Sequence, residues 1–114
     1  SSFMNAGIPL AAGSDAPVIE PNPLIGIYAA VTRRTDTDEV LGEGEGVSAG
    51  QAPRMYTTNA AYAAFQEADK GSIRAGKLAD LVLLDRDPTQ VDASQIAETK
   101  VTMTVLGGRV VWRP

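Results

Sequence analysis

The sequence predicts an α/β fold over residues 1–70, followed by a small antiparallel β unit over residues 71–114. Three observations support this division: an apolar run without alternation at 8–13, an amphipathic helical pattern at 23–33, and period-two alternation at 101–105. A short non-alternating run is typical of a strand buried on both faces in a parallel sheet. Period-two alternation indicates instead a strand with one buried face, as in antiparallel sheets.

The N-terminal residues resemble the end of one element and the start of another. Residues 1–6 fit the last turn of a helix, and Gly7 fits the residue that ends it. The strand predicted at 8–13 ends at Gly13, and Pro17 stops any continuation. A helix, a short connection and a buried strand in this order are typical of α/β architecture.

A helix is predicted at about 23–33. Asn22 is a good N-cap residue, and Pro23 suits the first helical position. One apolar face recurs at helical spacing along this segment, formed by Leu24, Ile27, Tyr28 and Val31.

A polar, glycine-rich stretch at 35–47 predicts an exposed and mobile loop, and a second helical segment follows at 48–65. Ser48 and Gln51 have the spacing of a capping box at its start. The run Thr57-Thr58-Asn59 predicts a break into two helices, with Asn59 capping the second. Helical spacing also places four aromatic residues in the predicted core: Tyr28, Tyr56, Tyr62 and Phe65.

The last 44 residues predict the β unit. A core strand is expected at 80–84, and one or two helical turns at 92–98. The alternating strand at 101–105 precedes Gly107-Gly108, which predicts a two-residue hairpin turn and a returning strand at 109–112.

Composition excludes several classes of protein. The net charge of −4 argues against nucleic acid as a partner, because binding phosphates needs a clustered basic face. The chain has no cysteine and no histidine, which removes disulfides, thiolate metal sites and the commonest general base. We expect no contact with a membrane, since no apolar run approaches the roughly 20 residues that span a bilayer. With no signal peptide visible, we expect a cytoplasmic protein.

Asp15 is the strongest candidate for a catalytic residue. It follows the predicted buried strand directly, where the carboxyl ends of strands carry catalytic groups in α/β barrels. From spacing alone, an aspartate that accepts backbone hydrogen bonds in a turn is the simpler interpretation. Glu20 and Asn22 lie nearby, in what is most simply a solvated loop.

Two other patterns are weaker evidence for a functional site. The acidic residues of the 35–47 loop lack the alternating ligand pattern of a calcium-binding EF-hand loop. The run "GEGEG" is not followed by the lysine of a phosphate-binding loop.

Four segments, in this order, resemble metal-dependent amidohydrolases: "AGIPLAAGSDAPV", "MYTTNAAYAAF", "KGSIRAGKLADLVLLDRDP" and "VTMTVLGGRVVW". The chain is most similar to the C-terminal part of the amidohydrolase-3 branch, whose members include enzymes that hydrolyse N-acyl or N-formyl bonds. The resemblance covers nearly the whole chain, and "GSIRAGKLADLVLLD" is its most specific segment.

The resemblance implies a (β/α)8 barrel with a small β-sandwich built from both chain ends. Residues 1–70 would supply the last strand, at 8–13, and the helices at about 23–33 and 48–65. Residues 71–114 would belong to the sandwich. The barrel would hold one or two divalent metal ions, usually zinc, and Asp15 matches the family's last metal ligand. By resemblance, Asp15 would also take a proton from the attacking water and pass it to the leaving nitrogen.

The family's histidine ligands all precede this aspartate, and the present chain contains no histidine. Catalytic zinc is held by about three protein ligands, of which this chain offers one. We therefore expect a C-terminal fragment that binds no metal and turns over no substrate by itself. The full-length enzyme would act on carbon–nitrogen bonds of a small amide or cyclic amide.

We also expect a homo-oligomer, because the strand edges and helix faces of a barrel fragment would be left without partners. The alternative is a stand-alone structural or interaction module without catalysis, binding a partner through the 35–47 loop. The upstream reading frame separates the two, since an N-terminal His-x-His would favour the enzyme.

Overall fold

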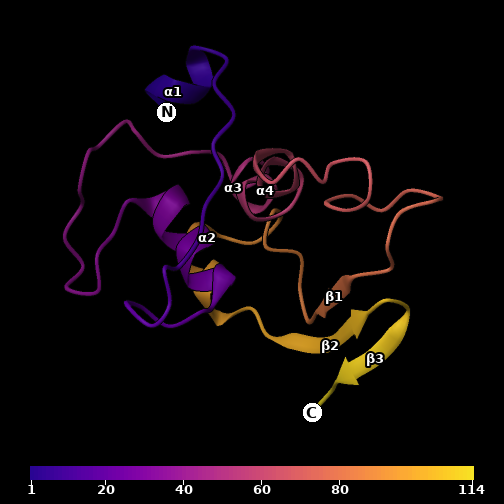
Figure 1. Cartoon of the computed structure of the whole chain (residues 1–114). Helices are drawn as coiled ribbons and strands as arrows, with labels where there is room; N and C mark the ends of the chain where they lie inside the picture. The colour runs from indigo at the N-terminus through magenta and orange to yellow at the C-terminus, as the bar shows by residue number, and fades with distance from the viewer.

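The computed structural model describes all residues from 1 to 114, and it has a helical part and a sheet part (Figure 1). The helical part contains α1 (Ser2–Asn5), α2 (Pro23–Thr32), α3 (Ala52–Tyr56) and α4 (Thr58–Ala63). The sheet part contains β1 (Leu81–Leu84), β2 (Val101–Leu106) and β3 (Arg109–Trp112). A 3₁₀ helix, η1 (Ala93–Glu98), lies between β1 and β2 in the sequence and packs against α2.

The helix predicted at about 23–33 is confirmed as α2. The side chain of Asn22 accepts a hydrogen bond from the Leu24 amide at 3.1 Å, and Pro23 occupies the first turn. The helix ends at Arg33, which adopts a left-handed conformation with φ 59°. All four residues of the predicted apolar face join the core cluster or pack against it.

The segment predicted as a helix at 48–65 forms two short helices, α3 and α4, that meet at Thr57. The capping box is present: the Ser48 amide donates to the Gln51 side chain at 2.9 Å, and the Gln51 amide donates to the Ser48 hydroxyl at 3.2 Å. The prediction that Asn59 caps the second helix is wrong. Thr57 is its N-cap residue, and the Asn59 side chain instead donates to the Leu10 carbonyl.

The strand predicted at 8–13 is absent from this structure, in which residues 8–14 form no strand ladder. A strand requires a neighbour with which to exchange backbone hydrogen bonds, and all three strands that the chain does form lie in the C-terminal sheet. The segment instead contacts α3 and α4, where the Ala12 amide donates to the Met55 carbonyl at 3.0 Å.

The sheet is antiparallel, with the strand order β1-β2-β3. Leu81 lies opposite Val105, which in turn lies opposite Val110, and each pairing contains one irregularity in register. Gly107 and Gly108 both have positive φ, at 55° and 79°. This is the backbone that a two-residue primed turn requires, so the predicted hairpin is confirmed.

The core is small and lies between α2, α3 and η1. Eight of the 114 residues are buried, and Ile96 of η1 is the largest side chain with no exposure at all. It shares a cluster with Leu24 and Ile27 of α2, and with Val47 and Ala52. The predicted core role is wrong for Tyr62 and Phe65, which are exposed, whereas Tyr28 and Tyr56 pack against the cluster.

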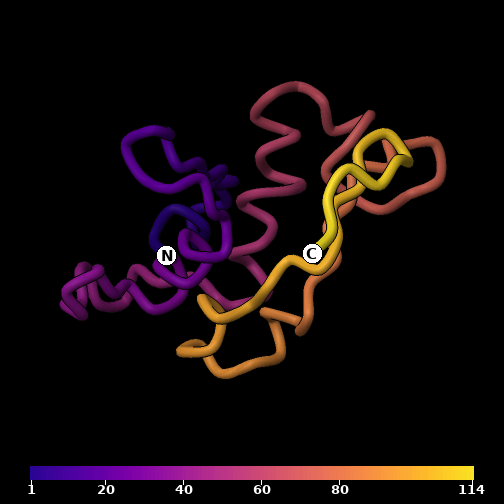
Figure 2. The backbone as a smooth tube through the Cα atoms, turned by 90° about the horizontal axis from the view of Figure 1, so that it is seen from below, coloured from indigo at the N-terminus to yellow at the C-terminus, as the bar shows by residue number.

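The sheet lies at one end of the molecule and α1 at the other, as the views in Figures 1 and 2 show. Only two strand residues reach the helical part, where Leu84 of β1 and Val101 of β2 pack against the core cluster. At the junction, the Lys100 amide donates to the Asp85 carboxylate at 2.9 Å, and this hydrogen bond lowers the pKa of Asp85 below its usual value. None of the helices is both long enough and apolar enough to cross a membrane.

Candidate functional site

Asp15 follows an extended segment that is hydrogen-bonded to helices α3 and α4. Two hydrogen bonds hold this segment, residues 8–14, against the pair α3 and α4. One runs from the Ala12 amide to the Met55 carbonyl at 3.0 Å, and the other from the Asn59 side chain to the Leu10 carbonyl at 2.9 Å. The helices thus position the backbone that leads into Asp15, a role of Asn59 that its sequence position does not reveal.

Asp15 itself begins a tight turn. Its backbone has φ 51°, in the left-handed region that aspartate tolerates better than most residues. The Val18 amide donates to the Asp15 carbonyl at 2.9 Å, and the Ala16 amide donates to the Ser14 hydroxyl at 3.3 Å. The turn is therefore closed by other groups, and the carboxylate of Asp15 is exposed and makes no hydrogen bond or ion pair.

A metal ion would need more ligands than Asp15 provides. No group of three or more histidine, cysteine, aspartate or glutamate side chains lies close enough together to hold one. A zinc ion takes four ligands in structural sites and about three from the protein in catalytic sites. The residues of this chain therefore do not make up a complete metal site, and Asp15 can contribute one oxygen ligand at most.

A cavity of about 350 Å³ lies between the segment that precedes Asp15 and helix α2. Gly13 and Ser14 form part of its wall, as do the loop at 19–23 and Tyr56 of α3. Burial raises the pKa of the Tyr56 phenol above its usual value. Most of the wall comes from residues 13–29, and Tyr56 lies 27 residues beyond the last of these.

Two residues noted beside Asp15 in the sequence have different roles. Glu20 lines the cavity and is exposed. Asn22 also lines it, but its side-chain oxygen caps α2. Neither belongs to a metal-binding group with Asp15.

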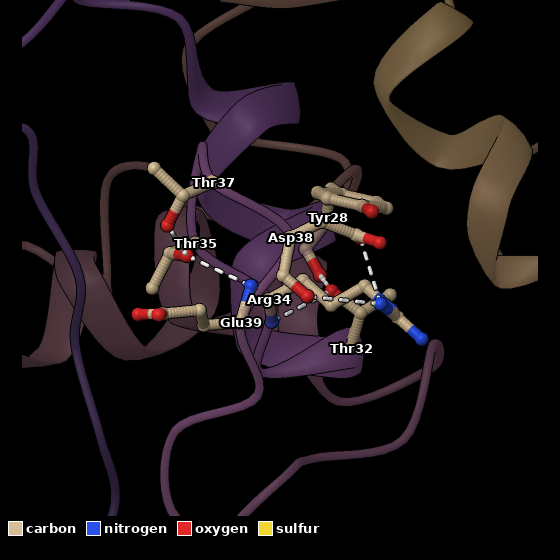
Figure 3. Close-up of polar contacts among 7 residues, drawn as sticks. All are labelled: Tyr28, Thr32, Arg34, Thr35, Thr37, Asp38 and Glu39. Atoms are coloured by element: carbon tan, nitrogen blue, oxygen red, sulfur yellow. Dashed lines mark hydrogen bonds and ion pairs between the residues drawn. The ribbon is translucent and has the colours of Figure 1, made fainter.

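Most of the loop predicted at 35–47 is exposed, but Val47 at its end is buried in the core cluster. The first part of the loop is held by local polar contacts (Figure 3). Arg34 forms an ion pair with Asp38 at 2.7 Å, and the Glu39 amide donates to the Thr35 hydroxyl at 3.1 Å. The Thr35 and Thr37 hydroxyls lie 2.9 Å apart. These contacts close a small turn and do not bring the loop's carboxylates together around a common centre.

Comparison with known proteins identifies the family. The family model described as Amidohydrolase family matches residues 1–112. An N-substituted formamide deformylase from Arthrobacter pascens is 37% identical over 107 residues, which cover 94% of this chain and 20% of the relative. A putative amidohydrolase from Bacillus subtilis (strain 168), YtcJ, is 32% identical over 114 residues, covering 97% and 22% of the two chains.

The fold is also found in a solved structure. An amidohydrolase from Thermotoga maritima MSB8 superposes with a TM-score of 0.74 at 23% identity, over 99% of this chain and 25% of that one. The present chain thus spans about a fifth of the length of the curated relatives that it matches. From the match over residues 1–112, we conclude that the chain belongs to the amidohydrolase family.

Proposed function

We propose that this chain is the C-terminal part of a metal-dependent hydrolase that cleaves non-peptide carbon–nitrogen bonds in amides or cyclic amides. Residues 1–70 would form the last part of its barrel, with residues 8–13 as the last strand once neighbouring strands are present. Residues 71–114 would form part of a composite β-sandwich. Membership of the amidohydrolase family and the similarity to a formamide deformylase support this proposal.

The observation that carries the proposal is the free carboxylate of Asp15. It lies on a segment that α3 and α4 hold in place, and nothing in the chain occupies its oxygens. Such a carboxylate can accept a proton and deliver it to a leaving nitrogen. The divalent metal, which we propose is zinc, would take most of its ligands from outside these 114 residues. The chain alone would then be inactive.

The test is a hydrolysis assay on the full reading frame that contains these residues, in parallel with the 114-residue chain. We expect the zinc-loaded full-length protein to release amine from N-substituted formamides, N-acyl amino acids or cyclic ureas. A chelator should abolish the activity, and added zinc should restore it. The chain alone should show none. A full-length protein that hydrolyses none of these compounds would support the non-catalytic module instead.

We further propose that the protein forms a homo-oligomer in the cytoplasm, with a small-molecule substrate and neither nucleic acid nor membrane as a partner. Apolar side chains on the sheet support self-association, since Leu106 and Val111 are both more than half exposed and Trp112 nearly so. The 114-residue chain should therefore show a mass of at least a dimer by light scattering at high concentration. A stable monomer under those conditions would contradict this expectation.

A further inference from the structure

The segment that leads into Asp15 is held along one edge of its backbone by α3 and α4, beside which it runs in Figure 1. The Leu10 carbonyl accepts a hydrogen bond from the Asn59 side chain at 2.9 Å, and the Ala12 amide donates to the Met55 carbonyl at 3.0 Å. In an extended backbone, the peptide groups of alternate residues face the same edge. Both hydrogen bonds therefore use one edge, and together they fix the rotation of the segment about its own axis.

Burial alternates along the same segment. The half-buried residues are Leu10, Ala12 and Ser14, and the exposed residues are Ala11, Gly13 and Asp15. Since the side chains of an extended chain alternate between two faces, a rotation or slip that moves one exposed residue inward moves all of them. The two hydrogen bonds thus decide on which face the segment presents Asp15.

No other contact holds the Asp15 side chain. Its carboxylate makes no hydrogen bond or ion pair, and only Gly13 and Ser14 separate it from the anchored residue Ala12. The turn after it is closed within itself, by the Val18 amide that donates to the Asp15 carbonyl, and has no hydrogen bond to α3 or α4. The position of the carboxylate therefore depends on how the preceding backbone is anchored.

Of the two anchors, Asn59 is the one that acts through a side chain. Asn59 is half-buried in α4, and its amide oxygen accepts a hydrogen bond from the Thr58 hydroxyl at 3.4 Å. This contact favours the orientation in which the amide nitrogen faces Leu10. An aspartate of the same size cannot replace Asn59, because an ionised carboxylate has no hydrogen to donate to a carbonyl.

We propose that Asn59 is the positioning residue of Asp15: through the Leu10 carbonyl, it fixes the backbone that presents the carboxylate to the reacting atoms. This inference rests on the hydrolytic function proposed above. Without the Asn59 amide, the segment keeps one anchor at Ala12 and can pivot about it. A misplacement of about 1 Å can lower a catalysed rate by about 10²-fold. Because proton transfer by Asp15 belongs to the transition state, the loss falls on kcat and not on KM.

The experiment measures hydrolysis by the zinc-loaded full-length protein, with the best amide substrate found in the assay described above. Asn59→Ala should lower kcat by about 10–100-fold and leave KM unchanged. Asn59→Asp should also lower kcat, since it removes the donor at constant side-chain size. Alanine is the best helix former, so Asn59→Ala does not weaken α4 itself. Asn5→Ala is the matched control, because Asn5 is exposed in α1, away from both anchors, and its kcat should be unchanged.

The same change in the Asp15→Asn background separates positioning from a general loss of structure. Residues that act as one unit have non-additive effects on the rate. Once residue 15 can no longer transfer the proton, its exact position matters little, so Asn59→Ala should lower the remaining rate by no more than about twofold. An equal loss in both backgrounds would mean that Asn59 acts on the protein as a whole, and the inference would be wrong.

Hydrogen exchange in the metal-free full-length protein tests the anchor without any activity. Peptides that cover residues 8–16 should exchange about five- to tenfold faster in Asn59→Ala than in the unmodified protein, because one hydrogen bond less opposes local opening. Asn5→Ala should exchange at the unmodified rate. A fall in kcat without faster exchange of these peptides would contradict the anchor.

The two measurements also separate this inference from the proposed function. If the protein hydrolyses amides and Asn59→Ala changes neither kcat nor exchange, the assignment of Asn59 is wrong and the hydrolase stands. If no amide is hydrolysed but exchange rises in Asn59→Ala alone, Asn59 anchors the segment as inferred and the hydrolytic function is wrong. Absence of both effects contradicts both.

Discussion

Replacing Asp15 with asparagine in the full-length protein should lower the rate of amide hydrolysis by about 10²–10⁴-fold, the usual contribution of a general acid–base group. Asparagine has nearly the same shape but cannot accept a proton as a carboxylate does. The fold should be unchanged, because the Asp15 carboxylate makes no hydrogen bond and asparagine also tolerates the left-handed backbone found there. Initial rates and far-UV circular dichroism measure the two effects separately.

The matched control is Asp36→Asn, which removes a carboxylate from the exposed loop at 35–47. This variant should hydrolyse amides at the rate of the unmodified protein. Full activity in Asp15→Asn would exclude Asp15 from catalysis. An equal loss in both variants would show that the effect comes from net charge and not from position.

Replacing Ile96 with alanine should lower the free energy of unfolding by about 2–5 kcal/mol, the usual cost of truncating a buried isoleucine. Ile96 has no exposed surface, and it joins η1 to α2 through Leu24 and Ile27. Since domains of this size are stable by only about 5–15 kcal/mol, this loss is a large part of the total. Urea unfolding of the 114-residue chain, followed at 222 nm, would report on the helices that Ile96 supports.

Ile73→Ala is the control for this change, because Ile73 is 87% exposed and the same atoms are removed. Its free energy of unfolding should change by no more than about 0.5 kcal/mol, as for most surface substitutions. Similar values for the two variants would mean that η1 does not pack on α2 in solution.

Local sequence signals predicted those elements whose cause is also local. The α2 helix begins where Asn22 and Pro23 place it, and the β2–β3 hairpin turns at Gly107 and Gly108. In both cases a side chain or a glycine acts on the backbone within a few residues. Such local effects can be predicted directly from the residue types.

Elements that depend on distant partners were predicted less well. The run at 8–13 has the composition of a buried strand but no neighbouring strand with which to pair in this chain. Tyr62 and Phe65 have helical spacing, yet nothing covers α4 on their side. The full burial of Ile96 depends on the packing of η1 against α2, across more than 60 residues of chain, and no local pattern indicates it.

The candidate site shows the same division. Asp15 could be singled out from its place after an apolar run and from the resemblance to amidohydrolases. The anchoring of Leu10 by Asn59 and the cavity against α2 could not be, because each results from segments brought together by folding.

The limited contact between the sheet and the helices affects how the chain unfolds locally. Of the strand residues, only Leu84 of β1 and Val101 of β2 pack against the core cluster, whereas α2 is fixed by both η1 and α3. Units with few shared contacts open separately, each with its own local free energy. Amide hydrogens of β3 can thus exchange with solvent while those of α2 stay protected. The chain's single tryptophan, Trp112, lies in β3. Its fluorescence therefore reports on unfolding of the sheet and not on the part of the molecule that contains Asp15.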